Sequence, residues 1–379
     1  MRILCQSEAY LPEVVGGAEV LTATLLEHLQ QRGHQILAMI SNQGSRPSGW
    51  HEWNGIPLRV FGMKQAIYSS AMPDILRIQK EVDETISEFR PDVIHINAIG
   101  ASNFFLLRRG RLKNIPRLVV LHAPVKMYDN AGLQNRLALE ADIVVAVSES
   151  VAEDAVSALP DIKSKLVLIR NALPQPALPP APLPVDSPLF LCLGRVTEEK
   201  GMDVAIEAMA ILRDRGMAVP LVIAGNGLYR KTLDQLVEAR SLQSIVRFQG
   251  WVHPDDVPAI INEATAVLVP SRWKEPFGLV ALQALQMGRP VIASRVGGLA
   301  DIAVDGVSGL VVPPNDAPAL AQAMADLIAD RQRLAAMGRN ARLRADAFDF
   351  ETLVRQYENA YVAAIERRAD PRPVRQLAS

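Results

Sequence analysis

The sequence predicts an α/β protein with two doubly wound domains, each a parallel sheet covered by helices. Apolar strand-like segments alternate with helical segments along nearly the whole chain, and parallel sheets with covered faces require that alternation. With 379 residues, the chain is too long for one ordinary domain and suits two. A proline-dense passage, residues 174–188, separates the halves and predicts a semi-rigid connector, because proline continues neither a helix nor a sheet.

In the first half, Gly16-Gly17 is expected to open a helix over residues 18–31 that ends at Gly33. Leu21, Leu25 and Leu29 would share one face of this helix. Ser148 is a good N-cap for a later helix, with Val151 within its reach. Strands are predicted at residues 2–5, 34–40, 91–96, 117–122 and 142–147.

The second half gives a more regular pattern. Strands are predicted at residues 189–194, 220–224, 245–248, 266–269, 290–293 and 309–312, and closing helices near 317–329, 330–345 and 350–367. We therefore place a first domain at 1–173, a linker at 174–188, a second domain at 189–348, and a closing helix with a tail at 349–379. In doubly wound folds, ligands bind at the carboxyl ends of the strands.

Composition and charge exclude several classes of protein. Hydrophobic residues make up 49% and charged residues 21%, as in a globular protein with ample core. A net charge of −1 provides no basic field for nucleic acid. The two cysteines, Cys5 and Cys192, lie in predicted strands and form neither a disulfide framework nor a metal-ligand spacing, so we expect inert core thiols.

The chain shows neither a secretory signal nor an apolar stretch long enough to cross a membrane, which predicts a cytoplasmic protein. The tail at residues 367–375 is basic and broken by prolines. We interpret it as a solvated terminus, with weak peripheral attraction to an anionic membrane surface as the alternative.

The segment from Glu275 to Gln283 is the most informative motif. A buried-looking strand at 266–269 leads into a polar loop, and a helix is expected from Phe277 to Met287. Glu275 therefore lies just before a helix N-terminus, whose first backbone N–H groups can hold a phosphate. A carboxylate suited to sugar hydroxyls beside donors suited to phosphate predicts a nucleotide-sugar site.

A second polar loop, residues 194–201, follows the first strand of the second domain. Arg195 and Lys200 lie at the carboxyl end of that strand, where both can converge on a diphosphate. The alternative, two solvated cations, loses weight because the Glu275 loop also follows a strand.

Glycine turns mark further candidates. Gly16-Gly17 opens a helix after a strand, so the backbone there could approach a phosphate closely; a simple turn at the helix entrance is the alternative. Gly225, within Gly225-Asn226-Gly227, and the pair Gly297-Gly298 fit plain tight turns equally well.

His122 ends an apolar strand of the first domain, where contact with substrate is the preferred interpretation and a structural hydrogen bond the alternative. His95 and Asn97 end another strand, and for them a structural role is the preferred interpretation. Hydrolase triads, zinc-protease motifs and Walker phosphate loops do not occur in the sequence.

Taken together, these segments resemble the retaining nucleotide-sugar glycosyltransferases of the GT-B fold, specifically glycosyltransferase family four (glycosyl transferases group 1). The matching pieces occur in the family's order and span nearly the whole chain. They are residues 12–19, 141–150, 170–172, Gly194-Arg195 with Lys200-Gly201, and 270–285.

The resemblance implies two Rossmann-like domains that face an interdomain cleft, with the closing helix crossing back to the first domain. It also implies a metal-independent, hexosyltransferase-like enzyme that needs no cofactor beyond a UDP-, GDP- or ADP-sugar co-substrate. The implied catalytic residues are His122, Glu275, Arg195 and Lys200. The implied donor-binding residues are Gly16, Gly17, Arg195, Lys200, Gly225, Trp251, Glu275, Phe277, Gly278, Leu279, Val280 and Gln283.

Gln283 departs from the family pattern, which usually has a second glutamate that accepts hydrogen bonds from the nucleotide ribose. Glutamine keeps one carbonyl acceptor and the length but loses the charge, so each ribose contact should weaken. We expect retained transferase activity with looser donor binding.

The expected function is transfer of a sugar from a nucleotide diphosphate to a glycan, lipid-linked or small-molecule acceptor held by the first domain. A nucleotide-sugar epimerase of similar shape and a non-catalytic nucleotide-sugar binder are the alternatives. The sequence does not identify the base of the donor, which would lie near Gly225 and residues 250–252. It does not identify the acceptor either, which would lie near residues 50–72.

Overall fold

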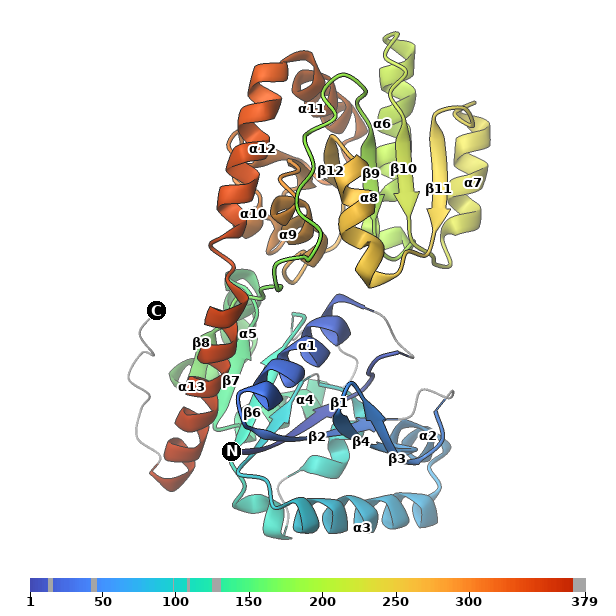
Figure 1. The fold of residues 1–379 in the computed structure, drawn as a ribbon. Helices are drawn as coiled ribbons and strands as arrows, with labels where there is room; N and C mark the ends of the chain where they lie inside the picture. Colours follow the sequence, from blue (N-terminus) through green and yellow to red (C-terminus); the bar gives the residue numbers. More distant parts are fainter. Residues whose placement is uncertain (13–15, 42–45, 98, 108–109, 125–130, 371–379) are drawn as a thin grey trace. The chain divides into compact units, whose positions relative to one another are not determined.

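The chain forms two compact α/β units, seen in a computed structural model that describes residues 1–12, 16–41, 46–97, 99–107, 110–124 and 131–370 (Figure 1). The first unit comprises Met1–Asn171 and Glu351–Ser379, and the second comprises Ala172–Phe350. Each unit has its own, largely parallel sheet. The α/β class with two doubly wound sheets, predicted from the alternation of strands and helices, is confirmed.

The first unit has an eight-stranded sheet in the order β3-β4-β2-β1-β5-β6-β7-β8. All pairs are parallel except β3 with β4. Five of these strands were predicted, whereas β3, β4 and β8 were not. The strands are β1 (Arg2–Ser7), β2 (Gln35–Ser41), β3 (Gly49–Trp53), β4 (Ile56–Phe61), β5 (Val93–Ile96), β6 (Arg117–Leu121), β7 (Ile143–Ala146) and β8 (Leu166–Leu168).

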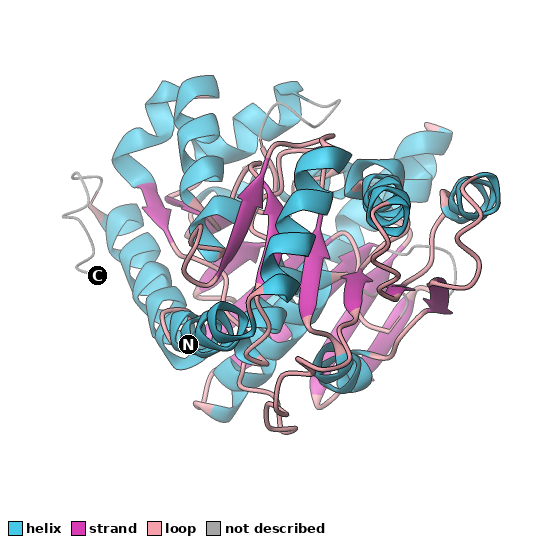
Figure 2. Ribbon diagram, turned by 90° about the horizontal axis from the view of Figure 1, so that it is seen from above, coloured by secondary structure: helices cyan, strands magenta, loops and turns pink. Residues whose placement is uncertain are grey.

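Helices cover the faces of this sheet (Figures 1 and 2). Helix α1 begins after Gly16 and ends before Gly33, whose φ of +89° suits glycine. At α5, the Ser148 hydroxyl accepts from the Val151 amide at 3.2 Å, which confirms the predicted cap. The helices are α1 (Gly17–Gln31), α2 (Met63–Ser69), α3 (Met72–Phe89), α4 (Ala131–Glu140), α5 (Glu149–Ala158) and α13 (Phe350–Ala369).

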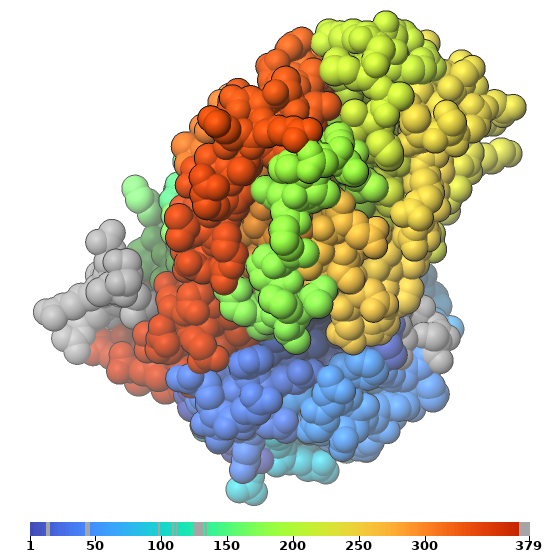
Figure 3. Space-filling model, turned by 45° about the horizontal axis from the view of Figure 1, so that its top comes forward, coloured from blue at the N-terminus to red at the C-terminus, as the bar shows by residue number. Residues whose placement is uncertain are grey.

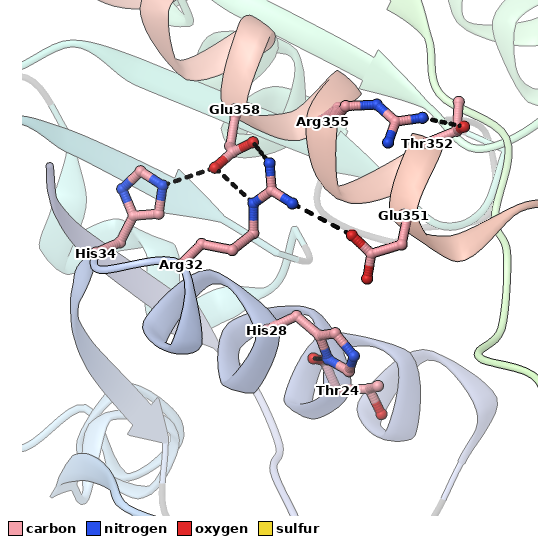
Figure 4. Close-up of polar contacts among 8 residues, drawn as sticks. All are labelled: Thr24, His28, Arg32, His34, Glu351, Thr352, Arg355 and Glu358. Atoms are coloured by element: carbon pink, nitrogen blue, oxygen red, sulfur yellow. Dashed lines mark hydrogen bonds and ion pairs between the residues drawn. The ribbon is translucent and has the colours of Figure 1, made fainter. Parts of the chain in front are cut away.

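Helix α13 closes the chain and packs within the first unit, as the resemblance implied. Its Tyr361 hydroxyl lies 2.7 Å from Nδ1 of His95, and its Tyr357 ring stacks on the same imidazole at 5.6 Å. Glu358 binds Arg32 at 2.9 and 3.0 Å and His34 at 2.9 Å (Figure 4). Partial burial alone would raise the pKa of Glu358, but the bonds from Arg32 and His34 lower it.

The second unit has a six-stranded parallel sheet in the order β11-β10-β9-β12-β13-β14. All six predicted strands are confirmed. They are β9 (Phe190–Leu193), β10 (Leu221–Ala224), β11 (Val246–Gly250), β12 (Ala266–Val269), β13 (Val291–Ser294) and β14 (Gly309–Val312). The chain leaves β9 toward β10 on one side and returns to β12 on the other, so the strand order reverses at the carboxyl ends of β9 and β12.

The helices of the second unit confirm the predicted closing pair, α11 (Ala317–Ala329) and α12 (Arg331–Ala345). The others are α6 (Met202–Asp214), α7 (Arg230–Ala239), α8 (Val257–Glu263), α9 (Leu279–Gln286) and α10 (Leu299–Ile302). Helix α9 begins at Leu279, two residues later than predicted, because Gly278 has a left-handed backbone with φ of +106° and cannot be part of the helix.

The proline-rich passage is fastened to the surface of the second unit, where Figure 3 shows it in green between α8 and α12. Proline has no N–H donor, so such a segment must be held through its carbonyl groups. Arg289, which is 1% exposed, donates to the carbonyls of Ala181 (2.8 Å) and Pro182 (3.3 Å). Other donors are Gln286 to Leu173 and Pro174, Asn262 to Pro179, and Thr265 to Pro184.

Both cysteines are buried core thiols, as predicted. Cys5 and Cys192 are free, and burial raises the pKa of each thiol to about 12. Among the described residues, no helix has the length and apolar character needed to cross a membrane. Residues 13–15 of the first glycine motif and residues 371–375 of the basic tail lie outside the described residues.

Candidate functional site

A buried carboxylate and a lysine meet where the strand order of the second unit reverses. Glu275 lies in the loop after β12 and is 5% exposed, and Lys200 lies in the loop after β9. The Lys200 ammonium is 2.5 Å from Glu275 Oε1, and the Ser271 hydroxyl donates to the same oxygen at 2.6 Å. The structure thus brings two of the predicted catalytic residues together from separate loops.

Glycines allow the loops to approach closely enough for this contact. A Cβ at Gly201, next to Lys200, would lie 2.0 Å from the carbonyl oxygen of Pro270. A Cβ at Gly297 would lie 2.1 Å from the carbonyl oxygen of Glu275, to which the Gly298 amide donates at 2.8 Å. The loop after β13 therefore packs against the backbone of Glu275, and Gly297-Gly298 have a packing role.

Arg272 locks the two loops against each other. Its guanidinium pairs with Asp203 and donates to the Glu198 carbonyl at 3.0 Å, while its backbone amide donates to the Glu199 carbonyl at 2.9 Å. Next to it, the Trp273 ring centre lies 5.1 Å from the Lys200 ammonium, a favourable cation–π distance. Lys200 is therefore positioned by a carboxylate on one side and an aromatic ring on another.

The segment after Glu275 presents a helix N-terminus. Phe277 is buried and packs edge-on against Phe348 at 5.7 Å, which anchors the turn. A side chain at Gly278 would collide with Leu299, so glycine is required there. The amides of Leu279 and Val280 lie in the first turn of α9, where backbone donors have no intrahelical acceptor. Gln283 is half-buried one turn further along.

Arg195 is placed differently from Lys200. Its side chain is 63% exposed, and its guanidinium lies 3.9 Å from the Glu199 carboxylate of the same loop. Arg195 is therefore free of the tight contacts that fix Lys200 and can reorient toward a ligand.

The Gly225-Asn226-Gly227 turn has a packing explanation. A Cβ at Gly225 would lie 1.8 Å from the Gly194 carbonyl oxygen, and one at Gly227 would lie 2.1 Å from that of Val196. The loop after β10 thus rests directly on the loop after β9. Trp251 follows β11 at 53% exposure, with its ring edge-on to His253 at 5.6 Å.

In the first unit, His122 directly follows β6, and its Nε2 lies 3.1 Å from Oδ1 of Asn97. Burial lowers the pKa of His122 to about 4, so the imidazole is neutral at pH 7. His95 is fully buried against α13, which matches the preferred structural interpretation. Gly16 and Gly17 form the entrance to α1.

Sequence reasoning missed Ser271, Arg272 and Trp273, which position Lys200 and Glu275. These residues lie between a buried strand and the predicted catalytic carboxylate, which was a usable signal for them, since loops at the carboxyl ends of strands carry ligand contacts. Their partners were not readable, because the Arg272–Asp203 pair spans 69 residues of sequence.

Within the part of the chain that the structure describes, no group of three His, Cys, Asp or Glu side chains could hold a metal ion. The charged side chains at the carboxyl ends of β9 and β12 include Lys200, Arg195 and Glu275. This set offers cations to a diphosphate and one fixed acceptor to hydroxyl groups.

Comparisons with known proteins identify both units. Residues 178–344 match the family model of glycosyl transferases group 1, and residues 15–174 match that of Glycosyltransferase Family 4. A glycogen synthase of Mycobacterium tuberculosis is 27% identical over 98% of this chain and 97% of its own length. An alpha-D-kanosaminyltransferase of Streptomyces kanamyceticus is 38% identical over 41% of this chain and 40% of its own.

Solved structures share the fold. A sucrose-phosphate synthase from Thermosynechococcus elongatus superimposes with a TM-score of 0.82 at 23% identity, over 95% of this chain and 98% of that one. HepE of Anabaena, in complex with UDP-glucose, gives 0.77 at 22% identity, over 96% of this chain and 100% of that one. With both halves matched by family models and the fold shared throughout, the chain belongs to the GT-B glycosyltransferases of family four, whose second half is the glycosyl transferases group 1 domain.

Proposed function

We propose that this nucleotide-sugar glycosyltransferase is a retaining enzyme that transfers a hexose to an acceptor hydroxyl without requiring a metal ion. The observation that carries the proposal is the Lys200–Glu275 pair, 2.5 Å apart at the carboxyl ends of β9 and β12. A fixed cation beside a fixed carboxylate suits a substrate with a diphosphate on one side and sugar hydroxyls on the other.

In this proposal, Lys200 and Arg195 neutralise the donor diphosphate. When the bond between the anomeric carbon and the diphosphate oxygen breaks, the electron pair leaves with the diphosphate, and these cations stabilise the added charge. The amides of Gly278, Leu279 and Val280 would add backbone donors, as helix N-termini do for phosphates. Glu275 and Trp273 hold the Lys200 side chain in place before substrate binds, so the side chain needs little reorganisation during the reaction.

Glu275 is assigned to the hydroxyls of the transferred sugar, and Gln283 to the ribose. Gly16, Gly17 and His122 are assigned to substrate from the first unit, and Gly225, Trp251 and Phe277 to the surroundings of the nucleotide. His122 and Glu275 are neutral and anionic acceptors respectively, which suits recognition of a polyhydroxylated sugar.

Retention follows if the acceptor oxygen attacks the face that the leaving group has just vacated. The new bond forms between that oxygen and the anomeric carbon, and the hydroxyl proton passes to the departing diphosphate. Relatives are named for α-linked products, such as the kanosaminyltransferase and an alpha-(1-6)-mannosyltransferase that is 35% identical over 159 residues, which agrees with retention from an α-linked donor. Product anomers resolved by NMR would test it.

The donor is proposed to be a UDP-, GDP- or ADP-sugar, and the acceptor a glycan, a lipid-linked sugar or a small metabolite. HepE is described with UDP-glucose, and the mannosyltransferase relative is GDP-mannose-dependent, so the family spans several bases. A thermal-shift screen of the full chain against nucleoside diphosphates and their sugars should identify the donor, because ligand binding to the folded state raises the melting temperature.

Metal independence is tested by assay in EDTA. Lys200 and Arg195 supply the positive charge that a divalent ion would otherwise provide, so activity should survive the chelator. A strict requirement for added Mg²⁺ or Mn²⁺ would contradict this part of the proposal. Conversion of the donor without any acceptor would instead favour the epimerase alternative, and donor binding without transfer to any of a panel of acceptors would favour the non-catalytic binder.

A further inference from the structure

Three side chains form a hydrogen-bonded row at the carboxyl ends of β1, β5 and β6. Ser7 is the last residue of β1, Asn97 follows β5, and His122 follows β6. The Asn97 amide lies between the other two, with Nδ2 at 3.5 Å from Ser7 Oγ and Oδ1 at 3.1 Å from His122 Nε2. Ser7 and Asn97 are both buried, and the Asn97 backbone is fixed by its bond to the Gln6 carbonyl at 2.9 Å.

Ser7 sets the direction of this row. Its hydroxyl donates to the carbonyl of Ala9 at 2.8 Å, and a hydroxyl has only one proton. Toward Asn97, Ser7 Oγ can therefore only accept, so the amino group of Asn97 must face it. At 3.5 Å this contact is long and weak, but it still decides which way the Asn97 amide faces. With the amide turned over, the lone pairs of Oδ1 would face those of Ser7 Oγ and repel them.

The orientation of Asn97 then fixes the proton on His122. With its amino group toward Ser7, Asn97 presents Oδ1 to the imidazole, and a carbonyl oxygen can only accept. Nε2 of His122 must carry the hydrogen. Since burial lowers the pKa of His122 to about 4, the ring is neutral near pH 7 and has one N–H, so Nδ1 carries the lone pair.

We propose that Ser7 and Asn97 are positioning residues that hold His122 as the Nε2–H tautomer, so that Nδ1 accepts a hydrogen bond from a substrate hydroxyl group. The assignment of His122 to substrate rests on the proposed function; the tautomer does not. The consequence is chemical selectivity. A hydroxyl can donate to Nδ1, whereas a carboxylate or phosphate oxygen would meet a lone pair and be repelled.

The neighbouring His95 supplies an internal comparison. Its Nδ1 contacts the Tyr361 hydroxyl at 2.7 Å, and because that hydroxyl can donate or accept, this contact fixes no tautomer; the Asn97 side chain also bonds His95. His95 is also the titratable group whose charge would be felt by His122, and burial lowers the pKa of His95 to about 3. Neither ring should therefore change protonation near neutral pH.

The tautomer can be read directly by NMR on the full chain labelled with 15N at histidine, at pH 7.5. The His122 signals are assigned as those lost in His122→Gln. We expect Nε2 of His122 to show the shift of a protonated nitrogen and Nδ1 that of an unprotonated one. A wild-type ring protonated on Nδ1, or averaged between both forms, overturns the proposal.

Variants of the relay sharpen the test. Asn97→Leu should leave the His122 tautomer unselected, so its two nitrogen shifts move toward each other, and Ser7→Ala should cause a smaller change in the same direction. Asn97→Asp keeps an acceptor toward Nε2, so Nε2 should stay protonated, while the added charge raises the pKa of His122 and the second carboxylate oxygen faces the lone pairs of Ser7. The His95 signals are followed as a second readout, because the Asn97 side chain also bonds His95, and thermal melts check folding. Unchanged His122 signals in a folded Asn97→Leu variant overturn the relay.

Activity separates this inference from the proposed function. Asn97→Leu should lower kcat/KM about tenfold through the lost hydrogen bond to substrate. If the spectra behave as expected but His122→Gln retains full kcat/KM, the assignment of His122 to substrate fails while the relay stands.

Discussion

Lys200 and Ser271 both bind the same oxygen of Glu275, Lys200 at 2.5 Å and Ser271 at 2.6 Å. One carboxylate oxygen of Glu275 is thus committed to the protein. The pair fixes a cation and an acceptor with respect to each other before any substrate is bound, which is the preorganisation that electrostatic catalysis requires.

Substitutions of Lys200 and of Glu275 should affect ligand binding differently. Lys200→Met should weaken the binding of the nucleoside diphosphate itself, because the Lys200 ammonium faces the diphosphate in the proposed complex. Glu275→Gln should leave the affinity for the nucleoside diphosphate nearly unchanged but should weaken the binding of the sugar nucleotide. Each should lower kcat/KM by roughly 10²–10³-fold. Calorimetric titration with the diphosphate and its sugar, alongside steady-state kinetics, measures both.

Lys274→Met is the matched control for this pair, since Lys274 is an exposed lysine of the same loop. It should retain wild-type kinetics. Equal losses of diphosphate affinity in Lys200→Met and Lys274→Met would mean that only the net charge of the loop matters.

Gln283 and Gln286 allow a paired test on one helix. Gln283→Glu should tighten donor binding by roughly tenfold, because a charged acceptor strengthens the bonds to ribose hydroxyls. Gln286→Glu makes the same chemical change three residues on, but there the side chain donates to the carbonyls of Leu173 and Pro174, at 2.9 and 3.1 Å. Gln286→Glu should therefore lower the stability of the protein without tightening donor binding.

Donor affinities and melting temperatures of both variants decide the question. An unchanged donor affinity in Gln283→Glu refutes the assignment of this residue to the ribose.

Arg289 should be decisive for the stability of the second unit. It is 1% exposed and bonds four backbone carbonyls: Ala181, Pro182, Asn262 and Met287. Arg289→Met leaves these acceptors without their donor, so we expect a loss of about 3–5 kcal/mol in the free energy of unfolding. Arg289→Lys should recover little, because one ammonium cannot reach four carbonyls in a fork.

Limited proteolysis adds a local measurement, with cuts expected within 174–188 in Arg289→Met before the rest of the chain is digested. Arg331→Met is the control, since Arg331 is an exposed arginine (65%) paired with Asp186 of the same segment. A resistant segment in the folded Arg289→Met variant would contradict this role.

His95 should make the first unit sensitive to acid. Burial lowers its pKa to about 3, so below its ordinary pKa of 6.5 the unfolded chain binds a proton that the folded chain does not. Stability is therefore full above about pH 6.5 and falls as the pH decreases, by about 2 kcal/mol at pH 5 from this residue alone. Urea unfolding at pH 7.5 and pH 5 measures the loss.

His95→Gln removes the titrating group while keeping a side chain that can meet Tyr361. It should be less stable than wild type at pH 7.5 but should lose less between pH 7.5 and pH 5. Parallel losses in both proteins would show that another group dominates the acid response.

The strands of the second unit were all predictable because they are mostly continuous apolar runs, such as Ala266–Val269. The first unit was harder. Strand β3 alternates half-buried and exposed residues, and it is joined to β4 by Asn54-Gly55, both with positive φ, so the Asn-Gly turn was the available signal and was overlooked. Helix α3 was overlooked too, although Ile78, Val82 and Ile86 repeat at helical spacing.

At the candidate site, the sequence pattern located each loop but not the contacts between loops. Lys200 and Glu275 were both predicted at strand ends, yet their pairing, and the contrast with exposed Arg195, depend on how Gly201 packs against Pro270. Direction of hydrogen bonding was equally hidden. Nothing in the strand pattern of His122 indicates that Asn97 would face its ring.

The docking of α13 has a consequence for the order in which the protein is made. Tyr361 and Glu358 complete the first unit, but the ribosome reaches them only after all of Ala172–Phe350 has been synthesised. At about 5–20 residues per second, this is a delay of roughly 10–40 s. Throughout that interval the nascent first unit lacks α13 and the contacts that α13 makes with His95, so completion of the first unit depends on completed translation of the second.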